Sequence, residues 1–252
     1  MRLFVFGLGY TAKAIVDALP EGWTVEATGA AGTVAFDDDE GVRVALARAS
    51  HVLSSVPPSE GDPVLERYGE ALGGGWLGYL SSTGVYGDTS GAWVDESSSL
   101  NGRRRERVAA DAAWLHRGAR VFRLPGIYGP GRSALDRVRE GKAHRIDLPG
   151  QVFSRVHVED IARGVVCAFD APPGAYNLAD DLPASGNAVT EEACRLLGIA
   201  PPPTQSLAEA KLSPQAAAFY GENRRVANGK AKRVLEWRLR YPTYREGLAS
   251  LA

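Results

Sequence analysis

The stretch LFVFGLGYTAKAIVDAL, residues 3–19, decides the fold. It begins with four apolar residues, as a buried strand does, and continues with apolar residues at helical spacing from Ala14 to Leu19. Gly7 and Gly9 separate the two patterns, and Ala12 follows three residues after Gly9. A strand, a Gly-x-Gly-x-x-Ala turn and a helix in this order predict the first unit of a parallel α/β sheet.

The small residues of this turn suit a dinucleotide. Gly7 permits a tight bend, Gly9 lets the backbone approach a pyrophosphate, and Ala12 lets the helix pack close to the strand. The first N–H groups of the helix then face the phosphates with a favourable dipole, and Tyr10 and Thr11 add hydroxyls there. The alternative is a glycine turn that serves packing alone.

The second strand, predicted at Thr24–Thr28, should supply the residue that distinguishes NAD from NADP. An acid would bind the ribose 2′-hydroxyl, and an arginine would bind a 2′-phosphate. Gly29 and Ala30 follow this strand, so neither side chain is present and the cofactor is NAD or NADP. Asp37 is a candidate contact for the adenine, although the acidic loop around it also fits a solvated surface.

Strands and helices alternate through the first half of the chain and predict a Rossmann-type, doubly wound parallel sheet. The alternation of strands and helices ends after residue 125, where turn-rich and proline-rich segments predict a small C-terminal substrate lobe. We assign residues 1–125 and about 153–179 to the NAD(P)-binding domain, and about 126–152 and 180–252 to the lobe. The expected strands are Leu3–Phe6, Thr24–Thr28, His51–Ser54, Gly78–Ser81 and Arg120–Leu124; the expected helices include Thr11–Leu19, Val42–Ala49, Pro63–Leu72 and Arg103–His116.

Composition limits the partners. With 252 residues, 44% of them hydrophobic, and a formal net charge of -1, the chain is typical of a globular protein and not of a nucleic-acid binder. No apolar run is long enough for a membrane span, and two cysteines outside any C-x-x-C motif fit a reducing, cytoplasmic compartment. The four histidines have no metal-ligand spacing, so we expect no metal site.

Three further segments carry a family resemblance: YLSSTGVYGD (79–88), RLPGIYGPGR (123–132) and SRVHVEDIA (154–162). The resemblance returns near the C-terminus in RRVAN and RYPTYREGL. Together with the glycine turn, these segments resemble the extended short-chain dehydrogenase/reductases, which include sugar-nucleotide epimerases and dehydratases. The chain is most similar to the atypical, NAD(P)-dependent epimerase/dehydratase-like branch.

The resemblance implies a catalytic hydroxyl at Ser82 and a Tyr-x-x-x-Lys pair at the start of the next helix. Those two positions hold Arg103 and Arg107. A guanidinium stays protonated and only donates hydrogen bonds, so Arg103 cannot replace the tyrosine as general acid/base. Tyr86 is the alternative proton donor.

The predicted helix over Arg103–His116 places these two arginines on one side. Val108, Ala112 and Leu115 would form its buried stripe. Arg107 would then reach the cofactor, and Arg103 would bind an anionic group of the substrate. The alternative is a solvated basic edge neutralised by Glu106 and Asp111.

Other residues take roles from the same resemblance. His157 is expected to be structural, and Arg155 and Arg224 are candidate ligands of the substrate. The cofactor-binding candidates are Gly7, Gly9, Tyr10, Thr11, Ala12, Asp37, Ser55, Val56, Pro57, Arg107, Pro125, Gly126 and Ile127.

Two functions remain open. One is an NAD(P)-binding oxidoreductase or epimerase/dehydratase-like enzyme that acts on a small, anionic substrate. The other is a catalytically inactive NAD(P)-binding sensor or partner-binding module.

Overall fold

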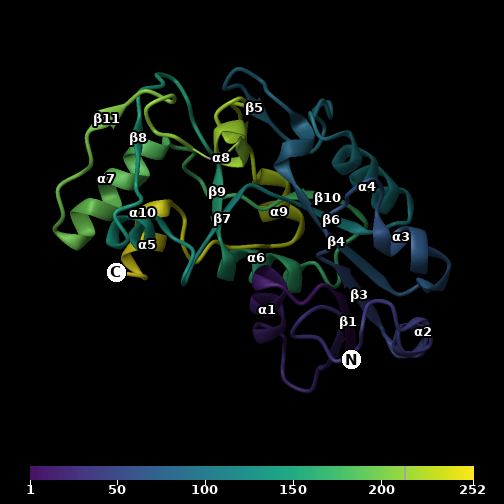
Figure 1. Ribbon diagram of the computed structural model, residues 1–252. Coiled ribbons are helices and arrows are strands. Elements are labelled where there is room, and N and C mark those ends of the chain that lie inside the picture. Colours follow the sequence, from purple (N-terminus) through teal and green to yellow (C-terminus); the bar gives the residue numbers. More distant parts are fainter. Residues whose placement is uncertain (213) are drawn as a thin grey trace.

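The structure, a computed structural model, describes residues 1–212 and 214–252. Its centre is a six-stranded sheet in which every neighbouring pair of strands is parallel (Figure 1). In spatial order the strands are β10 (Gly174–Asn177), β6 (Arg120–Leu124), β4 (Trp76–Ser82), β3 (His51–Ser54), β1 (Arg2–Phe6) and β2 (Thr24–Ala27). The predicted parallel sheet is confirmed.

Helices cover both faces of the sheet, as the alternation of side chains along β1 requires. Leu3 and Val5 belong to the core under α1 (Tyr10–Asp17), α6 (Val158–Cys167) and α9 (Gly229–Val234). Phe4 and Phe6 point to the other face and belong to the core under the remaining sheet helices. Those helices are α2 (Asp39–Arg48), α3 (Pro63–Tyr68) with the 3₁₀ turn η1 (Gly69–Ala71), and α4 (Arg105–His116). The doubly wound Rossmann-type fold is therefore confirmed.

The strand order places a switch point between β1 and β3. The chain leaves β1 to form β2 on one side and then returns to form β3 on the other. In open α/β sheets, ligands bind beyond the carboxyl ends of the strands at such a point. Gly7 follows β1 and Ser55 follows β3, so the predicted nucleotide segments meet there.

Helix α4 differs from its prediction. It begins at Arg105, and its buried residues are Ala110, Asp111 and Trp114 instead of the predicted Val108, Ala112 and Leu115. The reason is a buried ion pair between Asp111 and Arg123 of β6, which turns the helix so that this carboxylate faces the sheet. Asp111 consequently does not neutralise a solvated edge.

The rest of the chain forms small sheets and helices beside the central sheet. The sheets pair β7 (Gly126–Tyr128) with β9 (Arg155–His157), β8 (Arg145–Ile146) with β11 (Thr204–Gln205), and β5 (Trp93–Val94) with β12 (Arg225–Val226). The helices are η2 (Thr83–Tyr86), α5 (Ala134–Arg139), α7 (Gly186–Leu197), α8 (Pro214–Phe219) and α10 (Tyr244–Ala249).

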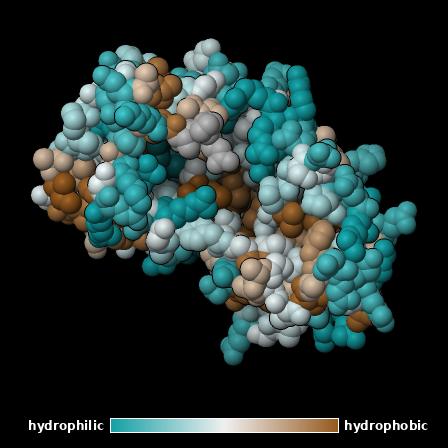
Figure 2. Space-filling model, viewed as in Figure 1, coloured by the Kyte–Doolittle hydropathy of each residue, from teal (hydrophilic) through white to brown (hydrophobic). Residues whose placement is uncertain are grey.

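A separate apolar core lies between α5, α7 and α10, around Leu135, Ala193 and Leu248. In Figure 2 the surface is hollowed between this part and the central sheet, and apolar side chains are visible in the hollow. Across residues 1–212 and 214–252, no helix has the length and apolarity needed to cross a bilayer.

Candidate functional site

The glycine turn has the geometry that the sequence predicts. Gly7 has a φ of 83°, in the left-handed region that glycine tolerates, and its N–H donates to the Thr28 hydroxyl over 3.1 Å. Gly9 caps α1 without any side-chain hydrogen bond, and a Cβ added to it would meet no atom within 4 Å. The backbone at Gly9 therefore faces open space beside the free end of a helix, which suits a pyrophosphate.

A cavity of about 340 Å³ opens at this turn, beyond the ends of β1, β3, β4 and β6. Ten predicted site residues line it: Gly9, Tyr10, Thr11, Ala12, Ser55, Pro57, Ser82, Arg107, Pro125 and Ile127. Residues far apart in the sequence thus form one nucleotide-sized site. We call it the nucleotide cavity.

Four other predicted cofactor residues lie outside this cavity. Gly7 and Val56 do not line the cavity. They pack against each other beside it, and a Cβ on Gly7 would lie 3.1 Å from Val56 Cγ2. Gly126 lines a neighbouring cavity. Asp37 lies on an exposed loop and lines neither cavity, so the structure gives it no part in the site.

Two arginines make the nucleotide cavity cationic. Arg107 is half-buried, and burial lowers the pKa of its guanidinium, which has no hydrogen bond or ion pair with any described residue. Arg132 was missed by the sequence reasoning; its Cζ lies 5.6 Å from the centre of the Tyr10 ring. The Tyr10 hydroxyl donates to the Pro130 carbonyl over 3.2 Å and holds this loop over the start of α1. The motif YGPGR contains Arg132 and was the sequence signal that could have identified it as a site residue.

Ser82 and Thr83 face two different cavities. Ser82 lines the nucleotide cavity, and its Oγ accepts the N–H of Gly84 over 3.1 Å, which leaves the hydroxyl proton free to be donated. Thr83 lines a larger cavity. The end of β4 therefore lies where the two cavities approach each other.

Tyr86 is buried away from both cavities. Its hydroxyl donates to Asn177 Oδ1 over 2.7 Å and accepts from Arg123 Nη1 over 3.1 Å. Burial raises the pKa of this hydroxyl. The same Arg123 pairs with Asp111, and Ser81 donates to Asp111 over 2.6 Å. Tyr86 thus belongs to a hydrogen-bonded core network, which gives it no path to a ligand.

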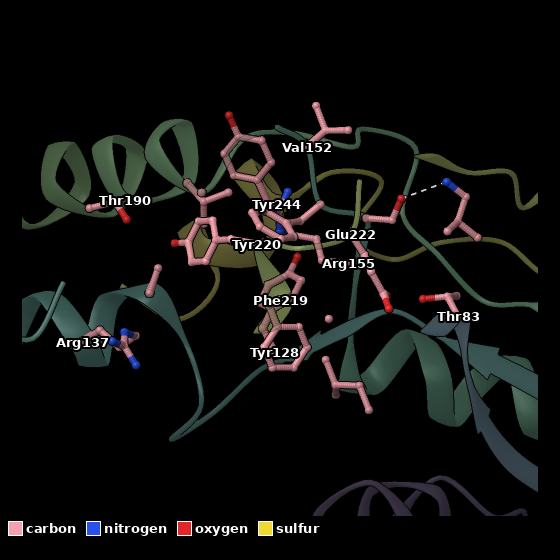
Figure 3. Close-up of a pocket in the computed structure, with 18 of the residues that line it drawn as sticks. Thr83, Tyr128, Arg137, Val152, Arg155, Thr190, Phe219, Tyr220, Glu222 and Tyr244 are labelled. Carbon is pink, nitrogen blue, oxygen red and sulfur yellow. Dashed lines mark hydrogen bonds between the residues drawn. The ribbon is translucent and has the colours of Figure 1, made fainter. Parts of the chain in front are cut away.

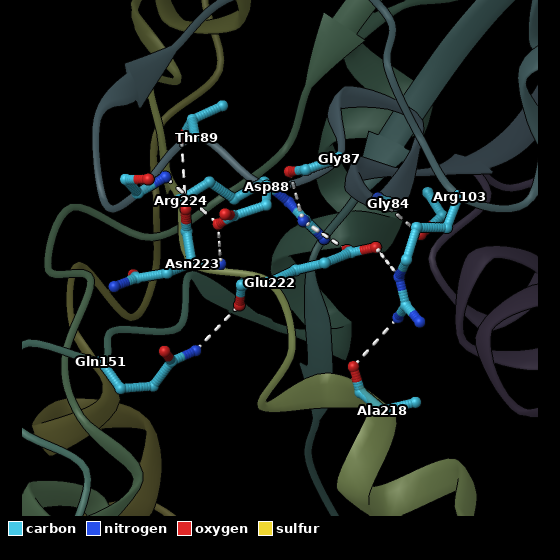
Figure 4. Close-up of polar contacts among 12 residues, drawn as sticks. Gly84, Gly87, Asp88, Thr89, Arg103, Gln151, Ala218, Glu222, Asn223 and Arg224 are labelled. Carbon is cyan, nitrogen blue, oxygen red and sulfur yellow. Dashed lines mark hydrogen bonds and ion pairs between the residues drawn. The ribbon is translucent and has the colours of Figure 1, made fainter.

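Arg103 also differs from its predicted place. It precedes α4, which begins at Arg105, so the one-sided spacing with Arg107 does not apply. Its side chain is 59% exposed, and Nε donates to Glu222 over 2.7 Å (Figure 4). Nη2 donates to the Ala218 carbonyl over 3.0 Å. Arg103 thus joins the residues before α4 to α8 and to the segment that follows it, and lines neither cavity.

The larger cavity has a volume of about 630 Å³ and shares one lining residue, Ile127, with the nucleotide cavity. Two candidate substrate ligands line it, Arg224 and Arg155, of which Arg155 is labelled in Figure 3. Arg224 Nη1 donates to Glu222 over 2.6 Å and to the Gly87 carbonyl over 2.8 Å. We call this space the substrate cavity.

His157 holds a structural position. It is fully buried, caps α6, and its Nδ1 accepts the N–H of Glu159 over 3.3 Å. Burial lowers the pKa of its imidazole. Within the described residues, no group of three or more metal-ligating side chains is present.

Comparison with known proteins places the fold. No family model matches the chain. A conserved protein of unknown function from Silicibacter pomeroyi is 40% identical, with a TM-score of 0.86 over 99% of this chain and 97% of that one. The chain belongs to the family of that protein.

More distant structures share the same fold and identify it as that of the extended short-chain dehydrogenase/reductases. The human epimerase family protein SDR39U1, solved with NADPH, is 16% identical, with a TM-score of 0.79 over 100% of this chain and 99% of its own. The dTDP-glucose 4,6-dehydratase of Bacillus anthracis, solved with NAD, is 17% identical, with a TM-score of 0.79 over 100% of this chain and 95% of its own. These structures confirm the fold that the resemblance implies.

One curated relative has a named activity. It is a 3-diazoavenalumate denitrifying reductase from a Streptomyces species, 31% identical over 140 residues. The match covers 51% of this chain and 45% of the reductase, so it spans less than half the length of that protein.

Proposed function

We propose that the protein is an NAD(P)-dependent oxidoreductase that acts on a small organic substrate. The observation that carries the proposal is that two cavities share Ile127 as a lining residue. A nucleotide sensor needs only the first cavity, whereas hydride transfer needs a second ligand beside the nicotinamide. Neighbours in the fold hold NAD or NADPH, and a partial relative is a reductase.

The residues of the nucleotide cavity fit a dinucleotide. The start of α1 and the open space at Gly9 would receive the pyrophosphate. Arg107 and Arg132 would pair with its charge, because both guanidinium groups line the cavity and neither has a carboxylate partner among the described residues. Ser55 and Pro57 would border the nicotinamide ribose. The dinucleotide would supply or accept the hydride.

Ser82 would orient the substrate oxygen. Its Oγ already accepts the Gly84 N–H, so its own proton is available for a carbonyl or hydroxyl of the substrate. Arg107 cannot exchange a proton at working pH, and Tyr86 is engaged in the core network. Among these candidates, Ser82 is left to bind the reacting oxygen.

A titration of the protein with NAD, NADH, NADP and NADPH tests the nucleotide site. Binding to the folded state raises the apparent melting temperature by mass action. At least one dinucleotide should give a saturable shift, and Arg107→Gln should weaken it about tenfold, as the loss of one charge-assisted hydrogen bond implies. Arg105→Gln is the matched control, since Arg105 is exposed on the same helix and lines neither cavity. The absence of any shift would overturn the proposal.

The sensor alternative makes a different prediction. A sensor would bind the dinucleotide but would not change its redox state with any substrate. A screen of carbonyl compounds with the preferred reduced dinucleotide, followed at the nicotinamide absorbance, separates the two functions. Oxidation that depends on the substrate supports the enzyme.

A further inference from the structure

Aromatic rings form much of the wall of the substrate cavity (Figure 3). Phe153 and Tyr220 meet edge to face, with ring centroids 5.4 Å apart, and Tyr128, Phe219 and Tyr244 also line the space. Rings of this kind pack best against another flat ring in offset or edge-to-face contact. The wall therefore suits a ligand with a planar, apolar body.

The same cavity carries an excess of positive charge. Arg137, Arg155 and Arg224 line it, and Glu222 is the one carboxylate side chain that does so within the described residues. Glu222 is already engaged, because Arg103 and Arg224 both donate to it. Among the described residues, no carboxylate lies within 4 Å of the guanidinium groups of Arg137 and Arg155. Arg137 donates to the Lys142 carbonyl over 3.0 Å and Arg155 to the Ala184 carbonyl over 3.1 Å, so a ligand that enters meets two cations that have backbone partners but no carboxylate partner.

Arg155 is the arginine of this cavity that a bound anion would stabilise most. The residue is 9% exposed, its Cζ lies 5.4 Å from the centre of the Tyr244 ring, and Nη2 donates to the Ala184 carbonyl. Nη1 is buried and has no hydrogen-bond partner. Burial without a paired charge lowers the pKa of the guanidinium. Leaving a buried cation unpaired is costly, so a nearby anion would stabilise it.

Asp180 does not supply that anion. It is the carboxyl that interacts most with Arg155, but its own Oδ2 is buried without a partner. Burial raises the pKa of Asp180 to about 7, so a large fraction of it is uncharged at neutral pH. Asp180 therefore compensates the charge of Arg155 only in part.

The cavity has few neutral polar side chains that could bind a sugar from both sides. No asparagine or glutamine lines it in the described chain, and of its hydroxyls those of Ser154 and Thr190 are used, whereas the Tyr128 hydroxyl is buried without a partner. Ser154 Oγ accepts the Val226 N–H over 2.9 Å, and Thr190 donates to the His144 carbonyl over 3.3 Å. Each sugar hydroxyl buried without a partner would cost about 1–3 kcal/mol. A flat apolar body avoids this cost.

We propose that the substrate is a flat organic anion, an aromatic or conjugated carboxylate. Its body packs between the rings, and its carboxylate lies at the side of Arg137 and Arg155. Arg137 and Thr83 lie at opposite ends of the cavity in Figure 3, so the far end of the ligand points to Thr83, next to Ser82 of the nucleotide cavity. That end reaches the nucleotide cavity. The proposal rests on the oxidoreductase function proposed above.

Calorimetric titration of the protein with cinnamate tests the proposed substrate class. Neutral cinnamamide and UDP-glucose serve as comparison ligands, and each titration is made with and without saturating dinucleotide. Cinnamate should bind at least about tenfold more tightly than the amide, and UDP-glucose should bind more weakly than cinnamate. Arg137→Gln should remove most of the preference for cinnamate and leave amide binding unchanged. Arg139→Gln is the control, because Arg139 is on the same helix but outside the cavity and pairs with Asp136 at 3.8 Å.

Three outcomes would overturn the proposal: equal affinity for cinnamate and cinnamamide, tighter binding of UDP-glucose than of cinnamate, or no binding of cinnamate, benzoate or 2-naphthoate. The two proposals fail separately. If a dinucleotide binds and no carboxylate does, the substrate class is wrong and the nucleotide site stands. If a carboxylate binds and no dinucleotide does, the oxidoreductase proposal is wrong and the anion site stands.

Discussion

Replacing Arg123 by methionine should destabilise the fold more than any surface change. The Asp111 carboxylate is 0% exposed and receives hydrogen bonds from Arg123 Nε at 3.1 Å, Arg123 Nη2 at 2.7 Å and Ser81 Oγ at 2.6 Å. Arg123→Met leaves only the serine bond to a buried charge. Breaking a buried pair in this way costs about 3–5 kcal/mol, a large part of the about 5–15 kcal/mol that stabilises a typical protein. At about 2–4 °C per kcal/mol, the melting temperature should fall by about 6–20 °C.

Urea unfolding followed by circular dichroism measures this loss as a change in midpoint at constant slope. Arg104→Met is the control, because the Arg104–Glu106 pair is at the surface, with the arginine side chain 60% exposed, and should contribute less than about 1 kcal/mol. Adding Asp111→Asn to Arg123→Met should recover part of the loss, since it removes the unpaired charge. A loss below about 1 kcal/mol for Arg123→Met, or no recovery in the double variant, would refute this account of the core.

Three other changes test the site. Gly9→Ala should leave stability within about 0.5 kcal/mol, because its Cβ meets no atom within 4 Å, yet weaken dinucleotide binding by about tenfold or more; unchanged binding would make the turn a packing feature. Ser82→Ala should reduce turnover by about a hundredfold or more without changing dinucleotide affinity, and full activity in a steady-state assay would remove Ser82 from the proposed reaction. Burial raises the pKa of Asp180 to about 7, whereas an aspartate in the unfolded chain has a pKa of about 3.9. Between about pH 4 and pH 7, the folded state therefore holds a proton on Asp180 that the unfolded state has lost. The contribution of Asp180 to stability is therefore lost as the pH rises from about 4 to 7. Asp180→Asn, compared with the unaltered protein by urea unfolding, should stabilise the fold more at pH 8 than at pH 5. An equal effect at the two pH values would contradict the raised pKa.

The nucleotide side of the molecule could be predicted from sequence because its signals are local. Gly7, Gly9 and Ala12 specify a turn within six residues, and Ser55 and Ser82 each follow an apolar strand directly. Parallel strands bring their carboxyl ends to one edge, so placing the strands also places these side chains together. The helix expected from Pro63 onward likewise begins there as α3, where the Asp62 carboxylate accepts the N–H groups of Val64 and Leu65.

The errors occur where tertiary contacts override a local pattern. The sequence places Asp111 on a polar helix edge, and only the position of Arg123 on the adjacent strand shows that the carboxylate is buried. Tyr86 belongs to a familiar motif, but its hydroxyl is engaged by Asn177, 91 positions further on. Contacts at such separations leave no periodic trace in the sequence.

The position of Arg103 connects the departure from the family pattern to the charge of the substrate cavity. A tyrosine there would be expected to face the reacting atoms, whereas this arginine lies before α4 and pairs with Glu222. Glu222 also pairs with Arg224, so the one carboxylate that lines the cavity in the described chain is shared between two guanidinium groups. Arg103, at the position where the resemblance implies a tyrosine, therefore compensates part of the negative charge of Glu222. Arg137 and Arg155 remain without carboxylate partners among the described residues, and this is the charge balance that favours an anionic substrate.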